Sequence, residues 1–349
     1  MSVSFRRIGR WVWTVFSLLA FLVSSLLFYS SPSDWVALLA KNFNLQSREV
    51  IVLVWHWPFG HPFELTACGS RFNIHGCHLT AEKELFSKAD AVLIHHREIA
   101  TDCSNLPTFP RPPSQKWVWM NHESPSHTEE IACLENVFNL TLSYRQDADI
   151  HMPYGSIVMT EKRPTVIPFK KRLVCWFVSN WKPQHRRVWY YKELRNHIRI
   201  HTYGIPFGRK VTESDYRLIV SSCKFYLSFE NSIHTDYITE KFYKALKLGS
   251  VPIVMGPSRQ NYEKFIPGDA FIHVDDFESP LGLAKHLQHL DQNEHSYRGF
   301  FRWQKDHEVS LTGIPLQNAC YTCDYIRRHP ERRTVKQLCK WFWDDTELS

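Results

Sequence analysis

Residues 224–256 read KFYLSFENSIHTDYITEKFYKALKLGSVPIVMG, and the architecture that we expect follows from this stretch. The runs 224–229 and 250–255 are short, apolar and rich in aromatic or β-branched residues, as in buried strands. Between them, residues 237–248 carry a helical pattern that ends at Gly249, and glycine favours the left-handed conformation that follows a helix. A strand, a helix and a strand in succession predict parallel strands joined by a crossover helix.

The same alternation continues on the N-terminal side of this stretch. Strands are expected at 49–55, 89–95, 115–121, 173–179 and 201–204, and helices near 81–88 and at 189–197, with a proline-containing linker at 153–171. We therefore predict an α/β fold with two Rossmann-like domains that face a cleft, because ligands of such sheets bind beyond the carboxyl ends of the strands. The chain has no G-x-G-x-x-G motif and no P-loop, which argues against a dinucleotide dehydrogenase or a P-loop NTPase.

An almost wholly apolar run, residues 11–30, precedes these domains. Its length of about 20 residues suits an uncleaved membrane anchor better than a signal peptide, whose apolar region is shorter. Arg6, Arg7 and Arg10 precede the run, so the positive-inside rule places the N-terminus in the cytosol and the rest in the lumen of the secretory pathway. The predicted parts are a cytosolic tail (1–10), a signal-anchor helix (11–30), a stem (31–47), a first domain (48–155) and a second domain with a C-terminal disulfide-linked segment (156–349).

The formal net charge of +7 over 349 residues is modest and permits an anionic ligand such as a nucleotide sugar. No Lys/Arg-rich block or nucleic-acid-binding module is present, so the composition argues against a nucleic-acid partner.

Nine cysteines in a luminal chain indicate disulfides rather than a four-cysteine zinc site. An odd total leaves at least one cysteine free or paired with another chain, and spacing alone does not fix the pairing. Asn139-Leu-Thr141 is the one glycosylation sequon, and we expect Asn139 to be a surface glycan acceptor.

Three polar clusters follow predicted strands. The first, 228–241, enters a helix whose N-terminus would meet an anion, with Lys241 in its first turns; the alternative is a solvent-facing Glu–Lys pair. The second, 178–187, ends at Arg187, which can bind phosphate oxygens through its planar guanidinium or lie on the helix surface. The third, 121–128, contains Glu123, which is either a candidate general base or a capping residue.

The sequence resembles the animal α1,3-fucosyltransferases of glycosyltransferase family 10, the Lewis-type enzymes. Besides the stretch quoted first, the resemblance rests on WHWPFG, FNIHGCHLT, HHREI, WVWMNHESP, FNLTLSYR and the closing KWFW, in order along the luminal chain. It implies a GT-B fold with an acceptor domain first and a GDP-fucose domain second. It also implies inverting transfer of fucose in α1,3 linkage to GlcNAc, which makes Lewis x or sialyl Lewis x structures on glycoproteins or glycolipids.

The resemblance assigns roles by matching position. Glu123 would be the general base, and Arg187 and Lys241 would neutralise the departing diphosphate. The other implied donor-site residues are Ser179, Asn180, Tyr226, Glu230, Asn231, Tyr237 and Glu240. The implied disulfides are Cys68–Cys320, Cys77–Cys323 and Cys175–Cys223, which leave Cys103, Cys133 and Cys339 open to free-thiol chemistry or dimerisation.

In this family the residue after His95-His96 is associated with the choice of acceptor linkage. Arginine at that position, here Arg97 beside His96, goes with strict α1,3 transfer to type 2 chains; the alternative is that Arg97 pairs with Glu98 and touches no sugar. His122 stands where leucine is usual, next to the implied base.

Asp147-Ala-Asp149 resembles a metal-binding D-x-D motif. We interpret it as structural, with no metal required although a divalent metal can stimulate, because protein cations normally stabilise the diphosphate in GT-B enzymes. The alternative functions are a fucosyltransferase that acts on protein hydroxyls and a non-catalytic glycan-binding Golgi protein.

Overall fold

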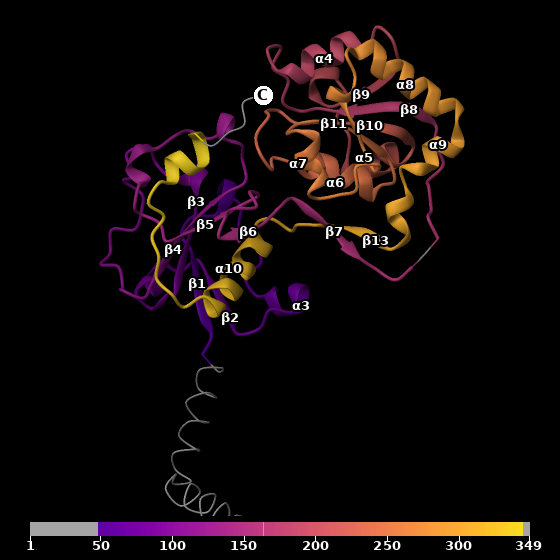
Figure 1. The fold of residues 1–349 in the computed structure, drawn as a ribbon. Coiled ribbons are helices and arrows are strands. Elements are labelled where there is room, and N and C mark those ends of the chain that lie inside the picture. The colour runs from indigo at the N-terminus through magenta and orange to yellow at the C-terminus, as the bar shows by residue number, and fades with distance from the viewer. Residues whose placement is uncertain (1–47, 163, 345–349) are drawn as a thin grey trace, which may run out of the picture. The chain divides into compact units, whose positions relative to one another are not determined.

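The structure, a computed structural model, describes residues 48–162 and 164–344. Among these residues no helix is both long and apolar enough to cross a bilayer, and the predicted anchor and stem lie outside the described ranges. Two parallel sheets and an antiparallel ribbon organise the described chain (Figure 1).

The first sheet has six parallel strands in the order β2-β1-β3-β4-β5-β6. Their bounds are β1 Val50–Val54, β2 Cys77–Thr80, β3 Ala91–His95, β4 Lys116–Asn121, β5 Leu140–Ser143 and β6 Ile150–His151. The connections include α3 (Cys68–Phe72) and short 3-10 turns, such as Lys83–Lys88, where we expected a longer helix. The crossovers therefore supply little helical surface to cover this sheet.

The second sheet has five parallel strands in the order β12-β11-β10-β8-β9. Its elements are β8 Arg172–Phe177, α4 Arg186–Leu194, β9 Ile200–Tyr203, α5 Glu213–Ser221, β10 Cys223–Phe229, α6 Glu240–Lys247, β11 Val251–Met255, α7 Arg259–Glu263, β12 Ile272–His273, α8 Pro280–Gln292 and α9 Glu294–Gly299. Strand β10 lies in the middle of this sheet, with fully buried Phe225 and Phe229 on the face that α4 and α8 cover. The predicted strand–helix–strand of residues 224–255 is therefore confirmed, with the helix three residues shorter at its start.

A two-stranded antiparallel ribbon joins the two halves. It pairs β7 (Gly155–Met159) with β13 (His307–Leu311), and β7 lies within the section that we expected to be a linker. Gly155 has no room for a Cβ atom, which would lie 2.6 Å from the ring of Tyr243. The chain thus crosses between the halves twice, side by side.

After β13 the chain returns to the first sheet, as the yellow segment of Figure 1 shows. Helix α10 (Leu316–Arg328) packs on one face, against Val52, Leu93 and Val118. The terminal turn Lys340–Asp344 covers the other face, where the ring of Phe342 lies 4.8 Å from that of Trp119. The predicted boundary at 155/156 placed this segment in the second domain; instead, it fills the two faces that the short crossovers leave open.

The structure forms the three disulfides that the resemblance implied, Cys68–Cys320, Cys77–Cys323 and Cys175–Cys223. It adds Cys103–Cys133, which we had left open, and leaves Cys339 free. Burial and the nearby carboxylates of Glu135 and Glu130 raise the pKa of Cys339 to about 12, so this thiol is a poor nucleophile.

Removing the disulfide between α3 and α10 should destabilise the fold more than removing the surface disulfide. Cys68–Cys320 spans 252 residues and Cys103–Cys133 spans 30, so the loop-entropy difference favours the first by about 2 kcal/mol. We expect Cys68→Ala/Cys320→Ala to lower the free energy of unfolding by about 2–5 kcal/mol, and Cys103→Ala/Cys133→Ala by less. Urea unfolding of the full chain measures both, and equal losses would contradict the ranking.

Candidate active site

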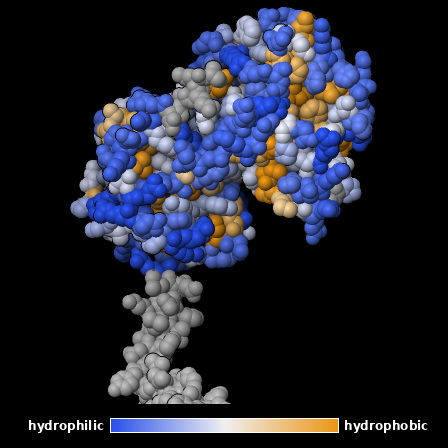
Figure 2. Space-filling model, in the orientation of Figure 1, coloured by the Kyte–Doolittle hydropathy of each residue, from blue (hydrophilic) through white to orange (hydrophobic). Residues whose placement is uncertain are grey.

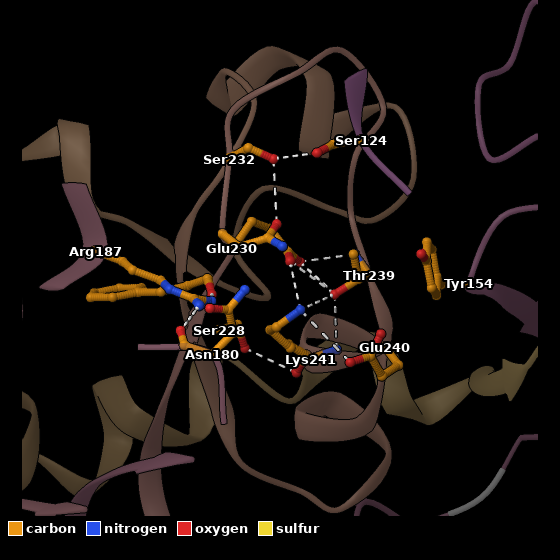
Figure 3. A network of polar contacts seen from close by, with 12 residues as sticks. Ser124, Tyr154, Asn180, Arg187, Ser228, Glu230, Ser232, Thr239, Glu240 and Lys241 are labelled. Carbon is orange, nitrogen blue, oxygen red and sulfur yellow. Dashed lines mark hydrogen bonds and ion pairs between the residues drawn. The ribbon is translucent and has the colours of Figure 1, made fainter. Parts of the chain in front are cut away.

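The most polar part of the second half lies between β10 and the first turn of α6 (Figure 3). Glu230 follows β10, and its fully buried carboxylate accepts hydrogen bonds from the backbone N–H and hydroxyl of Thr239, each at 2.9 Å. Lys241 donates to the same carboxylate at 2.9 Å and to the Thr239 hydroxyl at 2.9 Å. The strand end and the helix start are thus held together by one buried ion pair.

Lys241 lies where the dipole of α6 disfavours a cation, yet the structure keeps it charged. Burial lowers the pKa of Lys241, but the carboxylates of Glu230 and Glu240 raise it more, so the net shift is upward. The Lys241 side chain is 26% exposed, and its main partner is buried. The alternative of a solvent-facing Glu–Lys pair therefore does not describe this contact.

Arg187, near the start of α4, is also buried rather than on the helix surface. Its guanidinium donates to the carbonyl oxygens of Asn180 at 2.5 Å and Phe229 at 3.3 Å, and its Nε has no partner. Arg187 forms no ion pair in the described ranges; burial lowers its pKa, and the charge of the buried Glu230 carboxylate offsets this only in part. A buried cation with only neutral partners is costly, so this site favours an anionic ligand.

Glu123 lies in the loop that follows β4, which we call the base loop (residues 121–128). The Asn121 side chain fixes its backbone by accepting the Glu123 N–H at 3.1 Å. Its carboxylate has no hydrogen-bond or ion-pair partner among the residues described, and it is partly exposed. Burial lowers the pKa of His127, and the charge of Glu123 opposes this shift; burial and the charges of Glu230 and Glu123 raise the pKa of Tyr237, so the Glu123 carboxylate lies near enough to act on a residue of the second half.

His122, the departure from the family pattern, is buried behind Glu123. Its Nε2 donates to the Met152 carbonyl at 3.0 Å, and its own carbonyl accepts from the Tyr154 hydroxyl at 2.5 Å. Burial, and then the nearby His95, lower the pKa of His122 to about 3, so the ring is neutral at ordinary pH. His122 therefore anchors the base loop to the crossover segment that leads into β7.

Short hydrogen bonds join the base loop to the loop after β10. Ser232 donates to the Ser124 hydroxyl at 2.6 Å (Figure 3), and the Ser126 hydroxyl lies 2.6 Å from His234 Nε2. The imidazole Nε2 of His234 also accepts the Ser126 N–H at 3.3 Å, which assigns the hydrogen to Nδ1. The two loops that carry the polar clusters are therefore in direct contact.

Asp236 is a residue that the sequence analysis missed. It is buried, has a left-handed φ of 61°, and its carboxylate accepts from Gln146 N at 2.9 Å and from Asn261 Nδ2 at 2.7 Å. It thus links the first half to α7 next to Tyr237. Its position inside the TDYITEK run was a signal, but its partners lie 90 and 25 residues away and carry no local pattern.

Most of the predicted donor-site residues lie around these contacts. They are Ser179 and Asn180, exposed after β8, Asn231, which accepts from Ser232 at 3.3 Å, Tyr237, buried against Tyr144, and Glu240, 3.7 Å from Lys241. Tyr226 is 2% exposed within β10, against the rings of Phe177 and Tyr216, and its donor-site role stays a prediction. Alternation along β10 turns its side chain toward the face that α5 covers, which is also the face of Ser228, two residues nearer to the strand end.

Arg97 and His96 follow β3, and their side chains lie in different environments: His96 is buried and Arg97 is exposed. Both nitrogens of His96 are used inside the core, since Nε2 donates to the Glu129 carbonyl and Nδ1 accepts from Trp119. Burial lowers the pKa of His96 to about 4, which keeps it neutral, so the assignment of His96 to acceptor contacts is wrong for this structure. Arg97 is exposed, and Glu98 pairs with His95 rather than with Arg97.

The D-x-D carboxylates are both engaged by the protein. Asp147 pairs with Arg145 and accepts from the Trp341 indole at 2.9 Å, while Asp149 accepts from Thr141 and pairs with Arg333. Both aspartates thus stabilise the turn between β5 and β6 and the C-terminal return.

Asn139 does not lie on the surface as we expected. It is 3% exposed, its Oδ1 accepts the Trp117 N–H at 2.8 Å, and its Nδ2 donates to the Arg333 carbonyl at 2.6 Å. The predicted surface position is therefore wrong, and the modification itself stays a prediction.

Two family models match the chain. The model described as fucosyltransferase, N-terminal, matches residues 47–155, and glycosyltransferase family 10 (fucosyltransferase) C-term matches residues 167–341. The first covers the first sheet with β1–β6, and the second runs from just before β8 through α10 into the terminal turn.

Known proteins show the same likeness along most of the chain. The 4-galactosyl-N-acetylglucosaminide 3-alpha-L-fucosyltransferase 9 of Rattus norvegicus is 51% identical over 337 residues, which cover 92% of this chain and 94% of the relative. The enzyme of that name from Homo sapiens is 52% identical over 318 residues, covering 91% and 86%. The 4-galactosyl-N-acetylglucosaminide 3-alpha-L-fucosyltransferase FUT6 of Pongo pygmaeus is 41% identical over 299 residues, covering 84% and 82%.

A solved structure supports the fold independently. The crystal structure of an alpha1,3-fucosyltransferase with GDP-fucose aligns with a TM-score of 0.53 at 16% identity, covering 83% of this chain and 92% of that one. At this identity the likeness concerns the fold alone.

Proposed function

The chain belongs to glycosyltransferase family 10, the fucosyltransferases, and we propose how its site transfers L-fucose from GDP-fucose in α1,3 linkage to GlcNAc of type 2 chains. The names of its relatives give the linkage and the Galβ1-4GlcNAc acceptor. The observation that carries the assignment of roles is that the charges of Glu123, Arg187 and Lys241 all act on one residue of the base loop, His127, so an unpaired carboxylate and two cations surround it. In a GT-B arrangement, such a site lies between the acceptor-binding half and the donor-binding half.

The diphosphate of GDP-fucose takes its place beside Arg187 and Lys241. Arg187 forms no ion pair among the described residues, although the Glu230 carboxylate acts on its charge, and Lys241 lies in the first turn of a helix, where free N–H groups favour phosphate. As the bond between fucose and GDP breaks, negative charge grows on the leaving phosphate. Two fixed cations in a partly buried site stabilise that charge without having to reorganise.

Glu123 removes the proton from the 3-hydroxyl of GlcNAc as the oxygen attacks the anomeric carbon. The attack from the face opposite GDP inverts β-linked fucose to an α-linked product. The fixed backbone of Glu123 and its unpartnered carboxylate leave the oxygens free for the acceptor hydroxyl. The products on type 2 chains are Lewis x structures, and sialyl Lewis x where the galactose carries sialic acid.

We further propose that the enzyme is a single-pass type II protein of the Golgi membrane with a luminal catalytic part. The apolar run 11–30 after three arginines supports this topology, and four disulfides suit an oxidising lumen. We also propose a homodimer. A disulfide between two copies through Cys339 would require the half-buried thiol of Cys339 to become exposed. Protease protection of the luminal part in sealed microsomes tests the topology.

Replacing the base should abolish turnover while the fold is retained. Glu123→Gln keeps the shape of the side chain but cannot accept the proton, so we expect kcat to fall by about 10²–10⁴. Binding of GDP, measured by calorimetry, should not change. The matched control is Glu130→Gln, an exposed carboxylate just beyond the base loop, which should behave as wild type. Near-normal turnover of Glu123→Gln would refute the assignment.

Replacing either cation should impair use of the donor. We expect Lys241→Ala and Arg187→Lys to lower kcat by about 10²–10³ and to raise the KM for GDP-fucose, because each change weakens stabilisation of the leaving group. The KM for the acceptor should stay near wild type. Lys247→Ala, in the last turn of the same helix, is the control. An effect confined to the acceptor KM would show that the halves are assigned in the wrong order.

We propose that no metal is required, because protein cations serve the diphosphate and both D-x-D aspartates pair with arginines. The enzyme should therefore keep most of its activity in a chelator, although a divalent metal can stimulate it. Complete loss in the chelator, restored by manganese, would contradict this proposal.

A further inference from the structure

Phe59 has two unfavourable features that packing of the core does not explain. It lies in the turn Pro58–Gly60 after β1 with a left-handed backbone (φ 57°, ψ 22°), which costs a non-glycine residue about 1 kcal/mol or more. Phe59 is also 47% exposed. The face of the molecule in Figure 2 is largely hydrophilic with scattered hydrophobic patches, so exposed apolar side chains are a minority there. Strain together with an exposed aromatic ring is typical of a binding position.

The carboxylate of Glu98 holds this strained turn in place. The Phe59 N–H donates to Glu98 Oε1 at 2.8 Å, and the other oxygen of Glu98 pairs with His95. Burial raises the pKa of Glu98, but the hydrogen bonds from His95 and Phe59 lower it more, so the carboxylate stays ionised. Glu98 therefore joins the turn after β1 to the end of β3.

The ring of Phe59 also contacts the residue that we associate with acceptor choice. The Arg97 guanidinium lies 5.2 Å from the ring centroid, and the ring of His95 lies 5.0 Å away. Arg97 has no ion-pair partner in the described part of the chain. Its guanidinium instead makes a cation–π contact with the Phe59 ring.

These residues lie along one edge of the first sheet. Strands β1, β3 and β4 are adjacent and parallel, so Phe59, Arg97 and Glu123 follow carboxyl ends that meet at the same edge. At about 4.8 Å per strand, β1 lies about 10 Å from β4, which is close to the length of two linked sugar rings. A disaccharide with its GlcNAc at Glu123 can thus extend along the edge toward Phe59.

We propose that Phe59 is the stacking platform for the galactose of the acceptor, with Glu98 and His95 as positioning residues. Galactose presents a continuous face of C–H groups, and an aromatic ring recognises such a face through its electron-rich surface. The inference rests on the proposed function, and it explains why a strained, exposed phenylalanine is held by a carboxylate that also contacts His95. It assigns the galactose to the end of β1 and the GlcNAc to the end of β4.

The test separates the galactose from the GlcNAc. The full-length enzyme and Phe59→Asn are compared on Galβ1-4GlcNAc and on GlcNAc, both attached to the same aglycone. Asparagine tolerates the left-handed conformation, so this variant loses the ring without adding backbone strain. We expect the KM for the disaccharide to rise about tenfold, with kcat, the donor KM and the parameters for GlcNAc near wild type. Thermal stability should be unchanged or higher.

Two further variants complete the design. Phe59→Tyr keeps the ring and should retain the low KM for the disaccharide. Phe109→Asn removes a 52% exposed phenylalanine of the same half, whose ring lies against Phe86, and should leave both acceptors unaffected. An unchanged disaccharide KM in Phe59→Asn, or an equal loss on both acceptors, would overturn the platform. A wild-type enzyme that fucosylates neither acceptor would instead refute the proposed function.

Discussion

The covering of the first sheet by the C-terminal return is the constraint on which the rest of the structure depends. A parallel sheet is stable when both faces are buried, and the crossovers of this sheet are mostly short 3-10 turns. Helix α10 and the terminal turn supply the missing apolar surface, one to each face. Two disulfides join α10 to α3 and to the start of β2, so the sheet and its cover cannot separate. The ends of β1, β3 and β4, which carry the site of the first half, are rigid for this reason.

The sequence predicted β8, α4, β9, β10, α6 and β11 of the second half, because these strands and helices alternate over short stretches of chain; α5 and the elements from α7 to α9 were not predicted. Arg187, Lys241 and Glu230 could be found for the same reason, since all three lie at a strand end or a helix start. The pairing of β7 with β13 could not, because it joins segments about 150 residues apart and β7 is a short strand in a proline-containing section. The same limit applies to Asp236, whose partners come from β5–β6 and α7.

Burial explains the residues that the sequence placed wrongly. Asn139 and His96 are polar and lie in conspicuous motifs, so both resembled surface or site residues. In the structure their polar atoms satisfy backbone and indole groups that the C-terminal return buries, which no local pattern reveals. Tyr226 shares its face of β10 with Ser228, but it lies farther from the strand end, among the side chains that α5 covers. A motif locates a strand end reliably, but the face that each residue occupies depends on what packs there.

The geometry of the reaction depends on the loops rather than on a large interface between halves. The base loop touches the loop after β10 through Ser124–Ser232 and Ser126–His234, within a few residues of Glu123 and Glu230. Asp236 adds a buried bridge next to Tyr237, and its left-handed backbone lets the chain turn directly into α6. Because hydrogen bonds are short and directional, these contacts fix the carboxylate relative to the two cations far more closely than apolar packing of two domains would. In the function that we propose, donor binding and proton removal therefore share one set of contacts, because the loop after β10 is hydrogen-bonded to the base loop.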